Sequence, residues 1–166
     1  MGNLSVGAVL KQHGYTVQYL YGGDSYFDNM GDFFSHNGYE VIDRSAIKPA
    51  DVTFANILGV CDEDMFNKSL EVFDADAKRG KPFFGQIMTT SNHRPYTYPE
   101  GRIKVDGNPH TRDAAVKYTD YAIGKFIEQA AKKPWFDNTL FVIIADHCAS
   151  SAGKTTLPVD RYHIPC

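Results

Sequence analysis

Asp146 and His147 follow directly after the apolar stretch 139–145 (TLFVIIA). A carboxylate and an imidazole are ligands that zinc and manganese accept, and a buried strand would hold both donors in place. We therefore predict that these two residues bind a single divalent metal ion, with manganese, zinc and magnesium as the candidates. Two ligands are too few for a complete site, so further ligands must come from elsewhere. The alternative is a polar turn that only ends a strand.

Two further polar segments follow expected strands. His93 lies in the segment 90–96 (TSNHRPY), where its imidazole either donates a hydrogen bond to a phosphoryl or sulfuryl oxygen or packs among tyrosines. Asp24 follows two glycines that allow a close approach of the backbone, so its carboxylate either contacts a ligand or caps the next helix. Because ligands of parallel sheets bind beyond the carboxyl ends of the strands, we expect all three polar segments to open on one edge of the sheet.

The segment 148–155 (CASSAGKT) nearly reproduces the phosphate-binding P-loop pattern. Two features argue against that function. Cys148 replaces the first glycine, and the residues after Thr155 cannot form the helix whose N-terminus would face a phosphate. We therefore predict no nucleotide site here. Lys154 is still expected near an anionic substrate, and it joins His93 and Asp24 as a predicted substrate-binding residue.

Alternating helical and extended patterns surround these polar segments. Helices are expected at 4–12, 26–36, from 62 to about 80, and from 112 to about 132, and strands at 15–21, 39–43, 83–89 and 139–145. Acidic residues crowd the start of the third helix, where the helix dipole favours negative charge. The last strand is apolar on both faces, which is typical of a central parallel strand. The order of elements predicts a layered α/β/α fold with a largely parallel central sheet, within one domain over residues 1–166.

The composition excludes several classes of protein. Of 166 residues, 43% are hydrophobic and 22% are charged, and 17 basic against 20 acidic side chains give a net charge of −3. This near balance argues against nucleic acid as the main partner. The sequence contains neither a run of 18 apolar residues nor a signal-peptide pattern. The three cysteines have no zinc-type spacing, and a Cys61–Cys148 disulfide and free thiols are both open alternatives.

Three segments in order, 21–30 (YGGDSYFDNM), 90–96 and 145–147 (ADH), resemble the sulfatase-like catalytic domain of the lipoteichoic acid synthase family. That family belongs to the alkaline phosphatase superfamily of metal-dependent phosphoryl and sulfuryl transfer enzymes. The resemblance covers essentially the whole chain, and it implies that Asp146 and His147 are metal ligands and that His93 holds the substrate phosphate. It also implies that the family's threonine nucleophile and first acidic metal ligand lie upstream. The expected fold is then truncated at both ends, and the chain alone should have no turnover.

The resemblance also implies a substrate and a location. Family members are usually anchored by N-terminal transmembrane helices, so we expect a protein of the bacterial cell envelope with this domain periplasmic or extracellular. The membrane contact would come through segments absent from this chain. The expected reaction is transfer or hydrolysis of a phosphoglycerol or related phospholipid headgroup ester. Asp28 and Met30 stand where these synthases place a tryptophan and an arginine around glycerophosphate, which is a departure from the family pattern.

Two alternative functions and one assembly stay open. A sulfate ester hydrolase would carry a Cys/Ser-x-Pro-x-Arg motif, whose place is upstream of these residues. A non-catalytic remnant would bind or support a partner without turnover. A homodimer of the chain could cover the exposed edge of so short a sheet.

Overall fold

The computed structural model describes residues 3–148 and 164–166, and the chain divides into two compact units, Met1–Pro134 and Trp135–Cys166. In chain order, with η marking short 3-10 helices, the elements are α1 (Val6–Gln12), β1 (Thr16–Tyr21), η1 (Phe27–Asn29), α2 (Met30–His36), β2 (Glu40–Ile42), η2 (Arg44–Ala46), η3 (Pro49–Asp51), α3 (Asp62–Lys78), β3 (Phe83–Met88), α4 (Arg112–Ala130) and η4 (Phe136–Asn138). Across the described ranges, every helix is too short or too polar to cross a bilayer.

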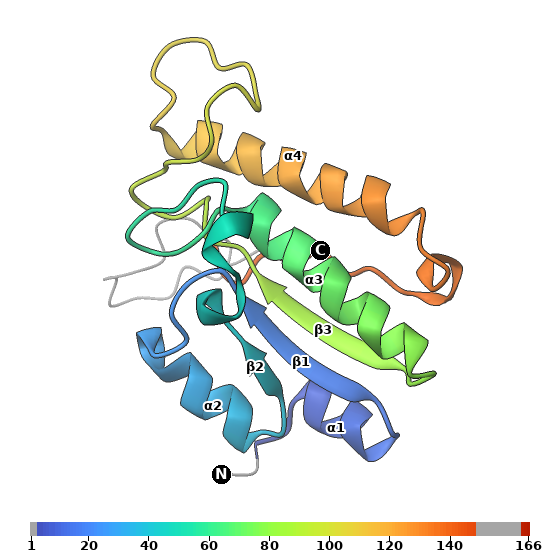
Figure 1. Cartoon of the computed structure of the whole chain (residues 1–166). Coiled ribbons are helices and arrows are strands. Elements are labelled where there is room, and N and C mark those ends of the chain that lie inside the picture. Colours follow the sequence, from blue (N-terminus) through green and yellow to red (C-terminus); the bar gives the residue numbers. More distant parts are fainter. Residues whose placement is uncertain (1–2, 149–163) are drawn as a thin grey trace. The chain divides into compact units, whose positions relative to one another are not determined.

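A three-stranded parallel sheet in the order β2-β1-β3 forms the centre of the first unit (Figure 1). The central strand β1 pairs with both neighbours, and Tyr21 at its end is in register with Met88 at the end of β3. The two strands therefore end at the same edge of the sheet. This arrangement confirms the predicted parallel pairing, and the loops that carry Asp24 and His93 both leave from that edge.

Helices α1 and α2 cover one face of the sheet. The alternate β1 residues Val17, Tyr19 and Tyr21 are buried in a cluster against which Leu10 of α1 and Phe34 of α2 pack. The Tyr19 and Phe34 rings stack with their centroids 3.7 Å apart. The period of two along β1 thus directs aromatic side chains to this face.

Helix α3 covers the opposite face, and α4 packs on α3 (Figure 1). Leu20 is fully buried on this side, and a Cβ at Gly85 of β3 would collide with the Phe73 ring of α3. Phe66 of α3 stacks on Phe126 of α4 with the ring centroids 5.0 Å apart. Helices on both faces of a parallel sheet make the first unit a layered α/β structure, as the order of elements predicts.

Two local details differ from the sequence prediction. The expected helix 26–36 is divided into η1 and α2, because Asp28 and Asn29 adopt positive φ angles of 49° and 57°. Such left-handed conformations interrupt a regular helix. Among residue types, glycine tolerates them best, followed by Asn and Asp. The helix expected at 4–12 begins only at Val6, because the Ser5 side chain accepts the Ala8 N–H and caps the helix there.

The second unit departs more clearly from the prediction, because residues 139–145 form no strand. The apolar side chains at 142–144 are exposed, and Leu140 is 88% exposed. A strand that is apolar on both faces needs ladder partners and cover on each face. In the described part of this unit, a backbone hydrogen bond links this stretch to a residue far along the chain. The Ala145 N–H donates to the Pro165 carbonyl at 3.3 Å. Local apolar character alone therefore does not make this segment a strand.

Candidate functional site

His93 occupies the last position of a tight turn that follows β3. The His93 N–H donates to the Thr90 carbonyl at 3.1 Å and closes the turn. The His93 side chain is exposed, and its Nδ1 lies 3.1 Å from the Arg94 carbonyl oxygen. Because a carbonyl oxygen can only accept, Nδ1 carries the proton in this arrangement. The imidazole is thus presented at the carboxyl edge of the sheet rather than packed among tyrosines.

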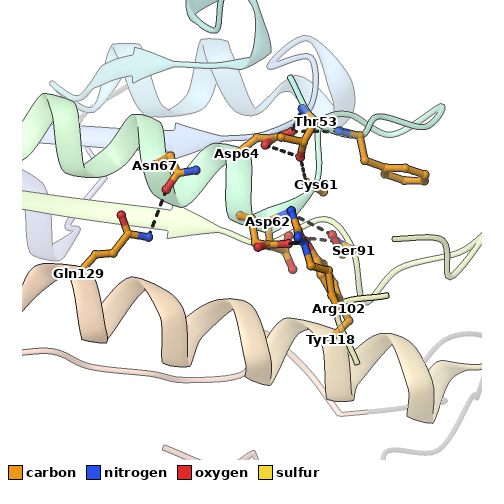
Figure 2. Close-up of polar contacts among 11 residues, drawn as sticks. Thr53, Cys61, Asp62, Asp64, Asn67, Ser91, Arg102, Tyr118 and Gln129 are labelled. Carbon is orange, nitrogen blue, oxygen red and sulfur yellow. Dashed lines mark hydrogen bonds and ion pairs between the residues drawn. The ribbon is translucent and has the colours of Figure 1, made fainter. Parts of the chain in front are cut away.

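The first turn of α3 supplies the bonds that hold this turn and two other loops. Asp62, Glu63 and Asp64 are consecutive, and each bonds to a different loop. Figure 2 shows the contacts of Asp62 with Ser91 and of Asp64 with Thr53. Asp62 and Asp64 are each only 2% exposed. Asp62 accepts backbone N–H groups of the Thr90–His93 turn.

Glu63 anchors the loop 95–109, which follows His93 and contains three prolines. The Arg102 Nε donates to the Glu63 carboxylate at 3.0 Å, and the Tyr118 hydroxyl of α4 donates to the same oxygen at 3.0 Å. The Tyr98 ring stacks on Tyr118 with the centroids 5.0 Å apart. The burial of Tyr118 raises the pKa of its hydroxyl strongly, so this group stays a proton donor. The loop is therefore fixed against α3 and α4.

Asp24 uses its carboxylate within its own loop. Its Oδ1 accepts the Tyr26 N–H at 2.9 Å, and the side chain is exposed. The two glycines before it allow the segment before α3 to approach this loop closely. The Gly22 carbonyl accepts the Val60 N–H at 2.9 Å. A Cβ at Gly23 would collide with the carbonyl of residue 58. Asp24 thus closes a local turn and does not cap the next helix, because the cap positions of η1 and α2 are Tyr26 and Asn29, without a side-chain cap bond. Its role in binding substrate stays a prediction.

Asp43 joins the loop after β1 to the end of β2. Its two carboxylate oxygens accept the N–H and hydroxyl groups of Ser25 and Ser45, at distances from 2.6 to 3.2 Å. Burial by itself would raise the pKa of the Asp43 carboxyl, but these hydrogen bonds outweigh it and hold that pKa below its usual value. The loop that carries Asp24 is thereby fixed to the neighbouring strand.

Asp146 and His147 lie in the second unit, and both side chains are exposed. The His147 N–H donates to Asp146 Oδ1 at 2.9 Å, and His147 Nε2 lies 3.7 Å from Asp146 Oδ2. His147 Nδ1 lies 2.9 Å from the Cys148 carbonyl oxygen, to which it must donate. This is the arrangement that leaves Nε2 free to bind a metal.

The donor chemistry of Asp146 and His147 fits a divalent cation as two of its ligands. Within residues 3–148 and 164–166, however, no group of three or more His, Cys, Asp or Glu residues is placed to hold a metal ion. The described residues therefore supply part of a coordination shell. Lys154 and most of the P-loop-like segment lie outside the described residues. The cysteines Cys61, Cys148 and Cys166 are free thiols in this structure.

The sequence misses the role of the acidic residues at the start of α3. Their pattern predicts a favourable interaction with the helix dipole, whereas the structure uses them to hold loops. The partners of Asp62 lie 28 and 57 residues away in the chain, at Thr90 and Thr119. No local periodicity reports such pairs. The one available signal is the run of three acids at a helix start, and it does not name their partners.

Comparison with known proteins gives consistent matches. The family model described as Sulfatase matches residues 2–166. Phosphoglycerol transferase I of Citrobacter koseri is 26% identical over 172 residues, covering 98% of this chain and 22% of that protein. Phosphoglycerol transferase I of Salmonella paratyphi B gives the same identity and coverage. The chain thus spans about a fifth of the length of these curated relatives.

Two solved structures share the fold. A protein in the alkaline phosphatase superfamily from Vibrio parahaemolyticus matches with a TM-score of 0.92 and 42% identity, covering 99% of this chain and 40% of that chain. The lipoteichoic acid synthase LtaP from Listeria monocytogenes matches with a TM-score of 0.80 and 23% identity, covering 97% of this chain and 44% of that chain. The second likeness is one of fold alone. Both confirm the predicted α/β architecture.

Proposed function

The chain belongs to the sulfatase family, and from that premise we propose that its residues form part of a metal-dependent phosphoryl transferase. The proposed substrate is a phosphoglycerol or related phospholipid headgroup ester, transferred to an acceptor hydroxyl or to water. The observation that carries this proposal is the similarity to phosphoglycerol transferase I over 98% of the chain. It favours phosphoryl over sulfuryl chemistry within the family.

Asp146 and His147 are the proposed ligands of the metal ion. Such an ion, when bound, lowers the pKa of a nucleophile and neutralises charge that develops at the phosphoryl group. The hydrogen bond from His147 Nδ1 to the Cys148 carbonyl supports this role, because it orients the ring and reserves Nε2 for the ion. The nucleophile is proposed to be a threonine outside residues 1–166, so we expect the 166-residue chain alone to have no turnover.

His93 is the proposed donor to a non-bridging phosphate oxygen. Its Nδ1–H is already used on the Arg94 carbonyl, so Nε2 can donate only when the ring is protonated. A protonated imidazole would also place a positive charge beside the phosphoryl oxygens. Lys154 and Asp24 stay proposed substrate contacts. Met30 accepts the Tyr19 hydroxyl through its sulfur at 3.0 Å, so this side chain is used within the fold rather than for the headgroup contact expected at this place in the synthases.

The proposed location is the bacterial cell envelope, with the domain outside the cytoplasm and the membrane contacted through segments outside these residues. A homodimer stays a second proposal about assembly. The order β2-β1-β3 leaves the outer edge of β3 without a strand partner among the described residues, and such an edge can pair with another chain.

The test compares two chromogenic esters in the whole protein supplied with manganese. We expect turnover of bis-p-nitrophenyl phosphate well above that of p-nitrophenyl sulfate, and none from the 166-residue chain alone. Faster turnover of the sulfate would favour the sulfatase alternative, which the family name itself keeps open. Absence of both metal and turnover in the whole protein would favour a non-catalytic remnant. Turnover of the phosphodiester by the 166-residue chain would contradict the proposed upstream nucleophile.

A further inference from the structure

Asp62 is a buried carboxylate that the proposed reaction does not use directly. Its Oδ1 accepts the backbone N–H groups of Thr90 at 2.8 Å and Ser91 at 3.1 Å. Its Oδ2 accepts the Thr119 hydroxyl of α4 at 2.7 Å. In return, the Asp62 N–H donates to the Ser91 hydroxyl oxygen at 3.1 Å. One side chain thus joins the start of α3, the exit of β3 and the middle of α4.

These bonds fix the turn at its first two residues. The Thr90 hydroxyl adds a bond to the Val60 carbonyl at 2.8 Å, just before α3. Thr90 and Ser91 are 5% and 2% exposed, while His93 two residues later is exposed. The Thr90 carbonyl in turn accepts the His93 N–H. A short, continuous hydrogen-bonded path therefore leads from the buried carboxylate to the backbone of His93.

The energetic weight of this contact is large for a single side chain. Hydrogen bonds to an ionised group are roughly twice as strong as neutral ones, and losing one partner leaves a buried donor without an acceptor. The geometry points to Asp62 as a positioning residue, which holds the Thr90–His93 turn so that the His93 imidazole meets the substrate phosphate. This inference rests on the proposed function for its catalytic consequence, whereas the hold on the turn is independent of it.

Asp64 provides a matched control two residues along the same helix. It is equally buried, and one of its oxygens accepts the Thr53 and Phe54 N–H groups at 2.9 and 3.3 Å. Its other oxygen accepts the Thr53 hydroxyl at 2.7 Å (Figure 2). Each carboxylate accepts two backbone N–H groups and a threonine hydroxyl, and Asp62 Oδ1 has a further, longer contact of 3.4 Å with the Thr90 hydroxyl. Asp64, however, holds a loop that does not contain His93. A general loss of stability would affect both variants alike.

The test combines hydrogen exchange with kinetics of the whole protein. In Asp62→Ala, the amides in peptides covering 89–93 should exchange roughly 10-fold to 100-fold faster, because two bonds to a charged acceptor are lost. The kcat should fall by roughly the same factor while KM changes little, because a misplaced His93 imidazole stabilises the transition state less. Asp62→Asn keeps an oxygen acceptor and should restore both values to within several-fold of wild type. Asp64→Ala should leave exchange at 89–93 and kcat within a few-fold of wild type.

A milder variant covers the case in which Asp62→Ala does not fold. Thr119→Val removes one bond to Asp62 Oδ2 and should raise exchange at 89–93 by roughly threefold to tenfold. If exchange at 89–93 is unchanged in the folded Asp62 and Thr119 variants, the inference that Asp62 holds the turn is wrong. An equal kcat loss in Asp64→Ala, or faster exchange with an unchanged kcat, would overturn the positioning role. If the wild-type whole protein has no phosphodiester turnover, the proposed function fails by itself, and the exchange measurement still decides whether Asp62 holds the turn.

Discussion

The Thr90–His93 turn and the Asp146–His147 pair look alike in the sequence and differ in the structure. Both follow an apolar stretch and end in a histidine. The first is held by Asp62 of a distant helix, and its backbone is buried at Thr90 and Ser91. The second is exposed, and the described bonds of His147 go to its two neighbours in the chain.

The difference shows what fixes a polar turn at the end of a strand. β3 pairs along its whole length with β1, so its end has a defined place against α3. Residues 139–145 have comparable apolar character but no ladder in this structure. Long-range partners, rather than local sequence, thus separate the fixed turn from the exposed pair.

The largest effect is expected from the exposed pair. The double variant Asp146→Ala, His147→Ala should lower phosphodiester turnover of the whole protein by at least about a thousandfold, because a catalytic metal contributes several kcal/mol to the transition state. The Asp32–His36 pair of α2, also exposed and 3.1 Å apart, provides the matched control. Asp32→Ala, His36→Ala should turn over normally. Equal losses in the two double variants would remove the special role of residues 146 and 147.

A smaller loss is expected at the fixed turn. His93→Ala should lower kcat about 100-fold, which is the usual cost of removing one donor to a developing negative charge. His110→Ala, another exposed loop histidine, is the control and should be close to wild type. Steady-state kinetics of both variants in the whole protein check this expectation. A His93 variant with normal kcat would leave the turn without a role in the reaction.

Hydrogen exchange compares the two turns directly in the 166-residue chain. The Ser91 amide should exchange roughly 100-fold more slowly than the His147 amide, because its acceptor is a buried carboxylate fixed by another helix. The acceptor of the His147 amide is the exposed carboxylate next to it. Similar protection at both amides, read by NMR, would break the contrast.

Cysteine reactivity gives the smallest expected difference. Cys61 precedes Asp62 and is 2% exposed, whereas Cys148 follows His147 and is half-buried. Burial raises the pKa of the Cys61 thiol, so less of the reactive thiolate is present at neutral pH. Iodoacetamide should label Cys61 at least about tenfold more slowly than Cys148, and the Cys61 rate should keep rising at pH values where an exposed thiol has levelled off. Equal rates, measured by mass spectrometry, would place the two thiols in similar surroundings.

Much of the fold could be predicted because its signals are local. The apolar face of Phe66, Leu70 and Phe73 predicts α3. Threonine favours helix starts, and Thr111 caps α4 by accepting the Ala114 N–H. The strand predicted at 139–145 is absent from the structure, because a strand depends on ladder partners that a short window of sequence cannot see. The same holds for Asp62, whose partners are far away in the chain. His93 could be selected as a candidate because it stands in a recognisable segment, and its role stays a prediction.

Metal binding by the whole protein tests the central claim most directly. Calorimetric titration of the metal-free protein with manganese should give one ion per chain in wild type and in His93→Ala. The Asp146→Ala, His147→Ala variant should bind none, because it lacks two ligands of the proposed site. Full manganese binding by this double variant, or no binding by wild type, would contradict the assignment of residues 146 and 147.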